Sequence, residues 1–128
     1  MRLHTILVPT DFSPAAQAAL DHAVSLARSK HAAILLLHVV DPMPAIGSHQ
    51  VFSTELQQSI EAAADRVRPA LDAIEVDAEV VVERLMLVGN PADQIVAIAA
   101  QHDVDLVVIG ASTRTARTRK GSEGTAAA

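Results

Sequence analysis

Residues that could bind a ligand or take part in a reaction follow two short apolar segments, residues 6–8 and 106–109. The first segment is followed by Pro9, Thr10 and Asp11, and the second by Gly110. The Asp11 carboxylate could contact a ligand, and a turn at Pro9 and Thr10 could present carbonyl and amide groups to the edge of a planar base. A glycine such as Gly110 lets a phosphate approach the backbone closely. These residues predict a nucleotide-binding crevice if the two segments are neighbouring strands of a parallel sheet.

Asp11 and Gly110 also have purely structural explanations, which stay open at this point. An Asp before a helix often accepts hydrogen bonds from free amides of the first turn, which stabilises a helix by about 1 kcal/mol. A Gly after a strand is common in simple turns. Gly121-Ser122 and Gly124-Thr125 could offer amides and hydroxyls to phosphates, or could belong to a flexible segment. Neither the Walker pattern nor G-x-G-x-x-G occurs in the chain.

Several classes of catalytic and metal site lack the residues that they need. The chain has no Cys, which excludes thiolate metal sites and thiol nucleophiles. Its six His residues include no pair at i and i+4, so the sequence predicts no metal site. We expect His38 to be a hydrogen-bonded residue of a sheet. No G-x-S-x-G nucleophile elbow occurs, and we predict no catalytic residues.

The apolar pattern predicts alternating strands and helices that would position these residues. Strands are expected over 3–8, 32–40, 76–87 (centred on 80–82) and 106–109, and helices over 14–30, 54–74 and 92–102. Asp11 or Ser13 would start the first helix, Pro69 should kink or shorten the second, and residues 41–53 form a long loop that could act as a lid. Residues 34–37 are apolar on both faces of their strand, as in parallel sheets covered by helices on both sides. The pattern predicts an α/β fold with a doubly wound parallel sheet.

Composition and charge narrow the classes of partner. The 128 residues predict one domain, and no apolar run approaches about 18 residues, so we expect a soluble cytoplasmic protein without membrane contact. Residues 1–109 carry six Lys and Arg against fourteen Asp and Glu, a net charge of −8, whereas residues 110–128 carry four against one, a net charge of +3. An acidic body without Trp or Tyr argues against nucleic-acid binding.

Four segments together resemble the universal stress protein family. They are ILVPTDFS at 6–13, LLHVVDP at 36–42, GNPADQIVAIA at 89–99 and DLVVIG at 105–110, and they follow the family's order and spacing over residues 1 to about 112. The resemblance implies a five-stranded parallel sheet of order 3-2-1-4-5 and cytoplasmic homodimers. In one branch of the family, it also implies ATP or AMP bound in the crevice between strands one and four.

The resemblance carries over to only half of that nucleotide site. The positions that contact adenine and ribose in the family match Pro9, Thr10, Asp11, Val39 and Ile109 of this sequence. Gly110 matches the first glycine of the family's phosphate loop, G-x2-G-x9-G-[ST], but Thr113 and Glu123 replace the second and third glycines. The resemblance therefore implies weak or degenerate binding of ATP or AMP.

The segment 111–128 differs from the family. It contains no Val, Ile, Leu, Phe or Met and resembles neither the family's last helix nor its fifth strand. We expect an α/β domain over 1–110 with strand order 3-2-1-4 and the fifth strand missing, followed by a basic, flexible tail over 111–128. The fourth strand would then be a bare edge, able to pair with a second chain.

Three functional hypotheses follow. The first is a universal stress response protein that binds ATP or AMP weakly or not at all, with Mg²⁺ accompanying ATP. The second is a protein-interaction module that binds no nucleotide and acts as a homodimer. The third is a slow ATPase, for which Asp11 beside a broken phosphate loop offers little of the machinery that phosphoryl transfer needs.

Overall fold

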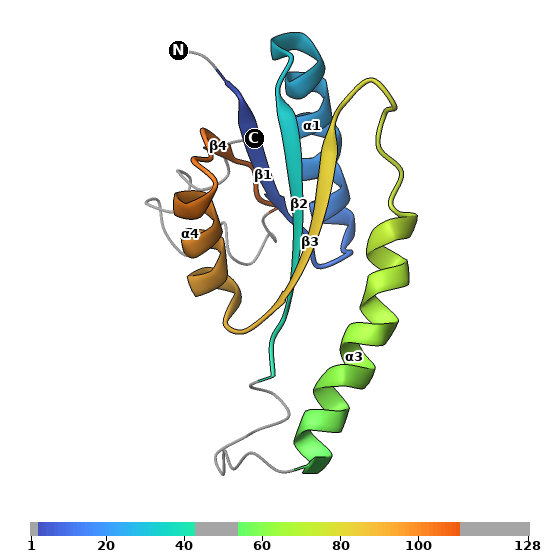
Figure 1. Cartoon of the computed structure of the whole chain (residues 1–128). Coiled ribbons are helices and arrows are strands. Elements are labelled where there is room, and N and C mark those ends of the chain that lie inside the picture. The colour runs from blue at the N-terminus through green and yellow to red at the C-terminus, as the bar shows by residue number, and fades with distance from the viewer. Residues whose placement is uncertain (1–2, 43–53, 111–128) are drawn as a thin grey trace.

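The computed structural model describes residues 3–42 and 54–110, and shows strands and helices in alternation (Figure 1). In chain order the elements are β1 (Thr5–Pro9), α1 (Pro14–Lys30), β2 (Ala33–Val40), α3 (Thr54–Ala73), β3 (Val82–Val88), α4 (Pro91–Gln101) and β4 (Leu106–Val107). The three helices and the first two strands lie within two residues of their predicted bounds.

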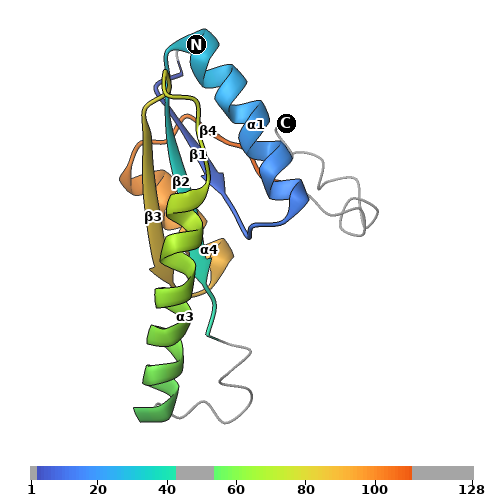
Figure 2. The ribbon, with the colours of Figure 1, turned by 90° about the vertical axis from the view of Figure 1, so that its right-hand side faces the viewer.

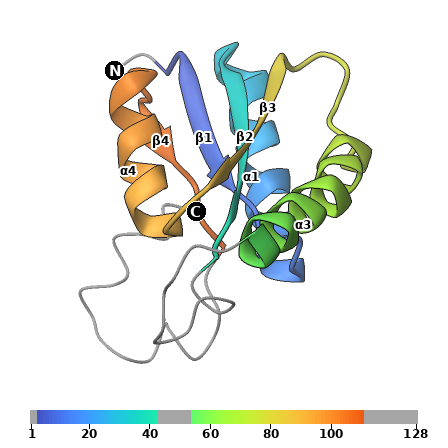
Figure 3. The same cartoon turned by 60° about the horizontal axis from the view of Figure 1, so that its bottom comes forward.

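The four described strands form one parallel sheet of order β3-β2-β1-β4. The registers pair Thr5 with Ala33 at the start of β1 and Pro9 with Leu37 at its end, and β4 pairs with β1 through Ile6 and Leu7. Figure 3 turns the carboxyl ends of the strands toward the viewer. The predicted α/β fold and the order 3-2-1-4 are confirmed, and β1 and β4 are neighbours.

The sheet separates two layers of helices. Apolar residues of α1 and α3 pack on one face, against Ile6, Val8, Ile34 and Leu36, and α4 packs on the other face, against Leu7, Leu35 and Leu37. Figure 2 shows the sheet nearly edge-on, with α1 along one side. Since β1 and β2 are covered on both faces, their apolar runs are continuous rather than alternating.

The sequence around α1 explains why this helix begins and ends where it does. Ser13 is the N-cap, and its hydroxyl oxygen accepts a hydrogen bond from the Ala16 N–H at 3.1 Å. Pro14 occupies the first turn, where its missing N–H costs nothing. At the other end His31 adopts the left-handed conformation, with φ of 58°, and its N–H bonds to the Ala27 carbonyl. These caps fix the helix directly after the β1 loop.

The third strand is displaced from its predicted centre. The sequence placed that centre at residues 80–82, whereas β3 spans Val82–Val88. Asp77 forms a turn in which its Oδ1 accepts from the Glu79 N–H at 2.8 Å and its carbonyl accepts from Val80 at 2.9 Å. The apolar run at 80–82 therefore leads into the strand, and the prediction was wrong because turn chemistry outweighed local apolarity.

The length of the fourth strand also needs correction. The fourth strand was predicted over 106–109 but contains only Leu106–Val107. After Val108 donates to the Leu7 carbonyl at 3.0 Å, the next ladder donor would be Pro9, which has no N–H. Of the two effects expected of Pro69, the shortening is not seen, because α3 continues to Ala73, and the kink stays a prediction.

Side-chain hydrogen bonds from Arg84 and to Asp105 tie the two outer strands of the described sheet to neighbouring elements. Arg84 of β3 donates from Nε to the Leu71 carbonyl at 3.2 Å and from an Nη to the Ile74 carbonyl at 2.7 Å, which holds the end of α3 against the sheet. Asp105, before β4, accepts from the N–H groups of His4 and Thr5 at 2.8 and 3.0 Å. The Asp105 carboxylate thus joins the starts of β1 and β4.

Asp105 should make the free energy of unfolding depend on pH in the acid range. The hydrogen bonds from the His4 and Thr5 amides lower the pKa of Asp105 from its ordinary value. A lowered pKa in the folded state means that the stabilisation is complete above the unfolded-state pKa of about 3.9 and is lost as pH falls through the folded-state pKa. Asp105→Asn keeps the acceptor without the charge. We expect its stability deficit, measured by urea unfolding, to be present at neutral pH and to shrink below about pH 4; a deficit that does not change with pH would contradict this role.

Some sequence predictions lie outside the described residues. These are the tail over 111–128, with its division from the domain at residue 110, and nearly all of the loop over 41–53 with its role as a lid. Among the described helices, none is both long enough and apolar enough to cross a bilayer.

Candidate functional site

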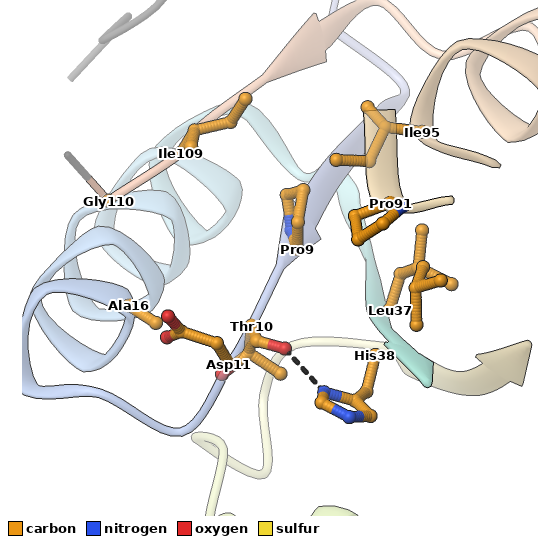
Figure 4. A pocket seen from close by; sticks show the side chains of 11 residues that line it. Pro9, Thr10, Asp11, Ala16, Leu37, His38, Pro91, Ile95, Ile109 and Gly110 are labelled. Atoms are coloured by element: carbon orange, nitrogen blue, oxygen red, sulfur yellow. Dashed lines mark hydrogen bonds between the residues drawn. The ribbon is translucent and has the colours of Figure 1, made fainter. Parts of the chain in front are cut away.

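A pocket of about 180 Å³ opens at the carboxyl ends of the strands, between β1 and its two neighbours. Its lining consists of Pro9, Thr10, Asp11, Ala16, Leu37, His38, Val39, Pro91, Ile95, Ile109 and Gly110. Figure 4 shows Ile109, Gly110 and Ala16 on one side and Leu37, Pro91 and Ile95 on the other, with Pro9 between them. All six residues predicted to contact a nucleotide lie in this lining, although their contact with a nucleotide stays a prediction.

Thr10 is the most constrained polar residue of the pocket. It is only 8% exposed, and its N–H donates to the Leu37 carbonyl at 2.8 Å. Its hydroxyl oxygen accepts from the Phe12 N–H at 3.0 Å, and its carbonyl oxygen lies 2.7 Å from Nδ1 of His38. The Thr10 N–H, which was expected from the sequence to face a base, is thus already bonded inside the protein. Of the Thr10 backbone, only the second lone pair of the carbonyl oxygen remains for a ligand.

His38 fixes the turn after β1 to the end of β2. Because the Thr10 carbonyl can only accept, the hydrogen of this bond is on Nδ1 of His38. The Phe12 ring packs against the imidazole, with ring centroids 4.8 Å apart and planes tilted by 37°. The prediction that His38 is a hydrogen-bonded residue of the sheet is confirmed, and the residue also lines the pocket.

Asp11 stands exposed beside the pocket and does not cap α1. Ser13 is the N-cap, and the Oδ1 of Asp11 instead accepts from the Ser13 N–H at 3.0 Å. Hydrogen bonds from the Ser13 hydroxyl and the Ser13 N–H lower the pKa of Asp11, so its carboxylate is ionised at neutral pH. A carboxylate offers about four acceptor positions, which leaves capacity for hydroxyl donors of a ligand.

The loop that carries Asp11 adopts an unusual backbone. Phe12 has φ of 66°, in the left-handed region that bulky residues seldom occupy. Such a conformation costs on the order of 1–3 kcal/mol and persists where surrounding bonds enforce it. Here the Thr10 hydroxyl holds the Phe12 N–H and Asp11 holds the Ser13 N–H. The strain turns the chain sharply, so that α1 starts immediately beside the pocket.

Val39 brings a backbone donor and a backbone acceptor to the pocket. Along β2, the Leu37 carbonyl accepts from Thr10 on the β1 side, whereas the Ile34 N–H donates toward β3. Ladder groups point to the same side at every second residue, so the N–H and carbonyl of Val39 also face the β1 side. The register of β1 with β2 ends at Pro9 and Leu37, two residues earlier. The Val39 pair therefore lies past the end of the β1 ladder, on the wall of the pocket.

Gly110 lies against the backbone of the first turn of α1. A Cβ atom added at Gly110 would lie 2.4 Å from the Ala15 carbonyl oxygen and 2.8 Å from the Ala16 nitrogen. Only a residue without a side chain fits this approach of strand end to helix. Close packing, rather than the simple turn considered from the sequence, explains the glycine here.

The sequence reasoning missed the wall that α4 supplies. Pro91 and Ile95 line the pocket, one turn apart on this helix, and Asn90 caps it by accepting from the Asp93 N–H at 3.0 Å. The segment Gly89-Asn90-Pro91 follows the carboxyl end of β3, and in a parallel sheet all such junctions meet at one edge. That signal could have identified Pro91; Ile95 follows only once the helix is placed.

The described lining of the pocket is mostly apolar and carries few charged groups. Asp11 is its single carboxylate, and it contains no Lys, Arg or Ser. Within residues 3–42 and 54–110, no group of three His, Asp or Glu side chains could hold a metal ion. An apolar slot with backbone hydrogen-bonding groups on one wall and a carboxylate beside it suits a flat heterocycle linked to a hydroxylated group.

Comparison with known proteins is consistent with this architecture. The family model described as "Universal stress protein family" matches residues 2–124, beyond the end of the resemblance seen near residue 112. The chain is 30% identical over 115 residues to Universal stress protein MJ0531 of Methanocaldococcus jannaschii, an alignment that covers 86% of this chain. The chain spans 65% of the length of that relative.

Two solved structures share the fold. Universal stress protein UspA from Lactobacillus plantarum is 30% identical, with a TM-score of 0.67 over 94% of this chain and 85% of the other. A universal stress protein solved in complex with cAMP is 25% identical, with a TM-score of 0.54 over 84% of this chain and 72% of the other.

Proposed function

The chain belongs to the universal stress protein family, and on this premise we propose that its pocket binds an adenine nucleotide, AMP or ATP, through the base and the sugar. The protein would then be a stress-response protein whose pocket is either empty or occupied by an adenine nucleotide. The relative solved with cAMP supports an adenine-containing ligand of this kind.

The backbone pair of Val39 is the observation that carries this proposal. Adenine presents an amino donor beside a ring-nitrogen acceptor, and one N–H and one carbonyl of the same residue complement such an edge. The apolar side chains of Pro9, Leu37 and Ile109 would cover the faces of the ring. Asp11, ionised and exposed, would accept hydrogen bonds from the ribose hydroxyls.

Isothermal titration calorimetry with AMP tests the proposal. We expect Asp11→Ala to weaken binding by about tenfold or more, because a hydrogen bond to a charged group contributes about 1.5–3 kcal/mol. Asp21→Ala is the matched control, since Asp21 is exposed on α1, bonds to Gln17 and does not line the pocket. The proposal is wrong if AMP gives no heat at millimolar concentration, or if both variants bind as the wild type does.

We further propose that the protein forms homodimers through the edge of β4 that no other described strand pairs with. Among the described strands β4 bonds only to β1, and Leu106 and Val107 are half-buried there. An unpaired edge of this kind offers backbone groups to a second chain. Light scattering over rising concentration should show a dimer, and a monomer at every concentration would contradict the proposal.

A further inference from the structure

Among the described residues, the polar groups around the pocket suit a base and a sugar but not a phosphate. We propose that the pocket selects the nucleoside itself: adenosine binds at least as tightly as AMP and more tightly than ATP. This inference rests on the proposed function and names the class of ligand that the same site prefers. Three features carry it, namely the use of the loop amides, the charge of the lining and the size of the cavity.

The loop between β1 and α1 has already used the amides that phosphate loops offer. Phosphates at such junctions are held by successive free N–H groups at the start of the helix. Here the Phe12 N–H is bonded by the Thr10 hydroxyl, the Ser13 N–H by Asp11 and the Ala16 N–H by the Ser13 hydroxyl. Pro14 has no N–H, and Gln17 donates to the Ser13 carbonyl. From Phe12 to Gln17 only the Ala15 N–H remains, and one amide does not make a phosphate cradle.

Gly110, in the segment that follows β4, fills the place beside that helix start. Gly110 lies so close to Ala15 and Ala16 that not even a methyl group fits between them. A glycine that allows a phosphate to approach needs open space over its Cα, whereas the space over Gly110 is occupied by protein backbone. The predicted role of Gly110 as a phosphate contact therefore has no geometric support on this side.

The charge of the described lining opposes a phosphate. Asp11 is ionised and exposed beside the pocket, and no Lys or Arg lies among the described residues that line it. Each phosphate charge brought near this carboxylate is repelled, by about 1 kcal/mol at 4 Å even in water. Ribose hydroxyls, in contrast, donate to a carboxylate. The same side chain thus attracts the sugar and repels the phosphates.

The size of the cavity agrees with a ligand held mainly by its ring. Its volume of about 180 Å³ is below the roughly 300–1,000 Å³ of pockets that enclose drug-sized ligands. An apolar cavity of about 150 Å³ is known to hold benzene. A flat heterocycle therefore fills the pocket, and groups attached beyond the sugar lie outside this cavity.

The test compares adenosine, AMP and ATP by calorimetry on the full chain, in one buffer without divalent metal. We expect the dissociation constant of ATP to exceed that of adenosine by about tenfold. Asp11→Asn removes the charge and keeps a side-chain acceptor for the Ser13 amide, so the ratio of the two constants should fall toward one. Asp21→Asn, which removes a charge outside the lining, should leave the ratio unchanged. High salt should also reduce the ratio by screening.

The outcomes separate this inference from the proposed function. ATP binding more tightly than adenosine would overturn the nucleoside preference while leaving an adenine site in place. A ratio that Asp11→Asn does not change would overturn the role given to the carboxylate. If none of the three ligands binds, the proposed function fails together with the inference. Circular dichroism of each variant confirms that the comparison is made between folded proteins.

Discussion

Leu37→Ala is expected to lower the free energy of unfolding by about 2–5 kcal/mol and also to weaken ligand binding, whereas Leu36→Ala is expected to lower stability alone. Both side chains are fully buried in β2, at adjacent positions and therefore on opposite faces of the sheet. Leu36 packs with α1 and α3, and Leu37 packs with α4 and lines the pocket. The pair separates the contribution of the core from that of the site.

The physical reason is the cavity that each truncation leaves. Native domains are stable by only about 5–15 kcal/mol, so either substitution removes a large fraction of the total. In Leu37→Ala the new space joins the pocket, and a flat ring loses apolar contact worth about 0.8 kcal/mol for each buried methylene. Urea unfolding and AMP calorimetry, done where both variants are folded, give the two readouts. Equal losses of affinity in the two variants would contradict the assignment of Leu37 to the pocket wall.

Gly110→Ala is expected to destabilise the protein by about 1–3 kcal/mol and to abolish measurable AMP binding, although it adds a single methyl group. The added Cβ would lie 2.4 Å from the Ala15 carbonyl oxygen, and both partners are backbone atoms that no rotamer change can move. The segment that follows β4 must then shift away from α1, and Ile109 and Ala16, on that wall of the pocket, move apart.

A comparison with Gly89 sharpens this expectation. Gly89→Ala would bring its Cβ to 2.8 Å from the Gln94 side chain, which can rotate away, but it also forces Ala into a backbone with φ of 154°. The double variant Gly89→Ala/Gln94→Ala should recover the steric part of the loss, whereas no side-chain truncation near Gly110 should rescue Gly110→Ala. Wild-type stability and AMP affinity in Gly110→Ala would show that the strand and the helix are not held at this distance.

Much of the fold was predictable because its signals are local. The continuous apolar run of β2, the apolar stripe of α1 and the Ser13-Pro14 start each depend on residues close in sequence. The centre of β3 was misplaced because Asp77 forms a turn that outweighs the apolarity of Val80 and Val81. The length of β4 was overestimated because its partner Pro9 cannot continue the ladder, which becomes visible only when the two strands are paired.

The site was predictable as a set of residues but not as a set of interactions. The residues themselves pointed to Pro9, Thr10, Asp11 and Gly110, the family resemblance added Val39 and Ile109, and all six line one pocket. Their amides and carbonyls, however, are used differently from the expectation. The Thr10 N–H is bonded to Leu37, and Asp11 bonds to Ser13 instead of capping α1.

Composition and periodicity act over a few turns or residues, and they were enough to predict the alternation of strands and helices, the acidic balance of residues 1–109 and the polar residues that follow β1. Which of those polar groups remain available depends instead on contacts between distant elements. The bond between Thr10 and His38 spans 28 positions, the Gly110 contact joins opposite ends of the chain, and the α4 wall comes from the far side of the sheet. Such contacts depend on the packing of distant elements against one sheet, and no local pattern of residues encodes the distances between them.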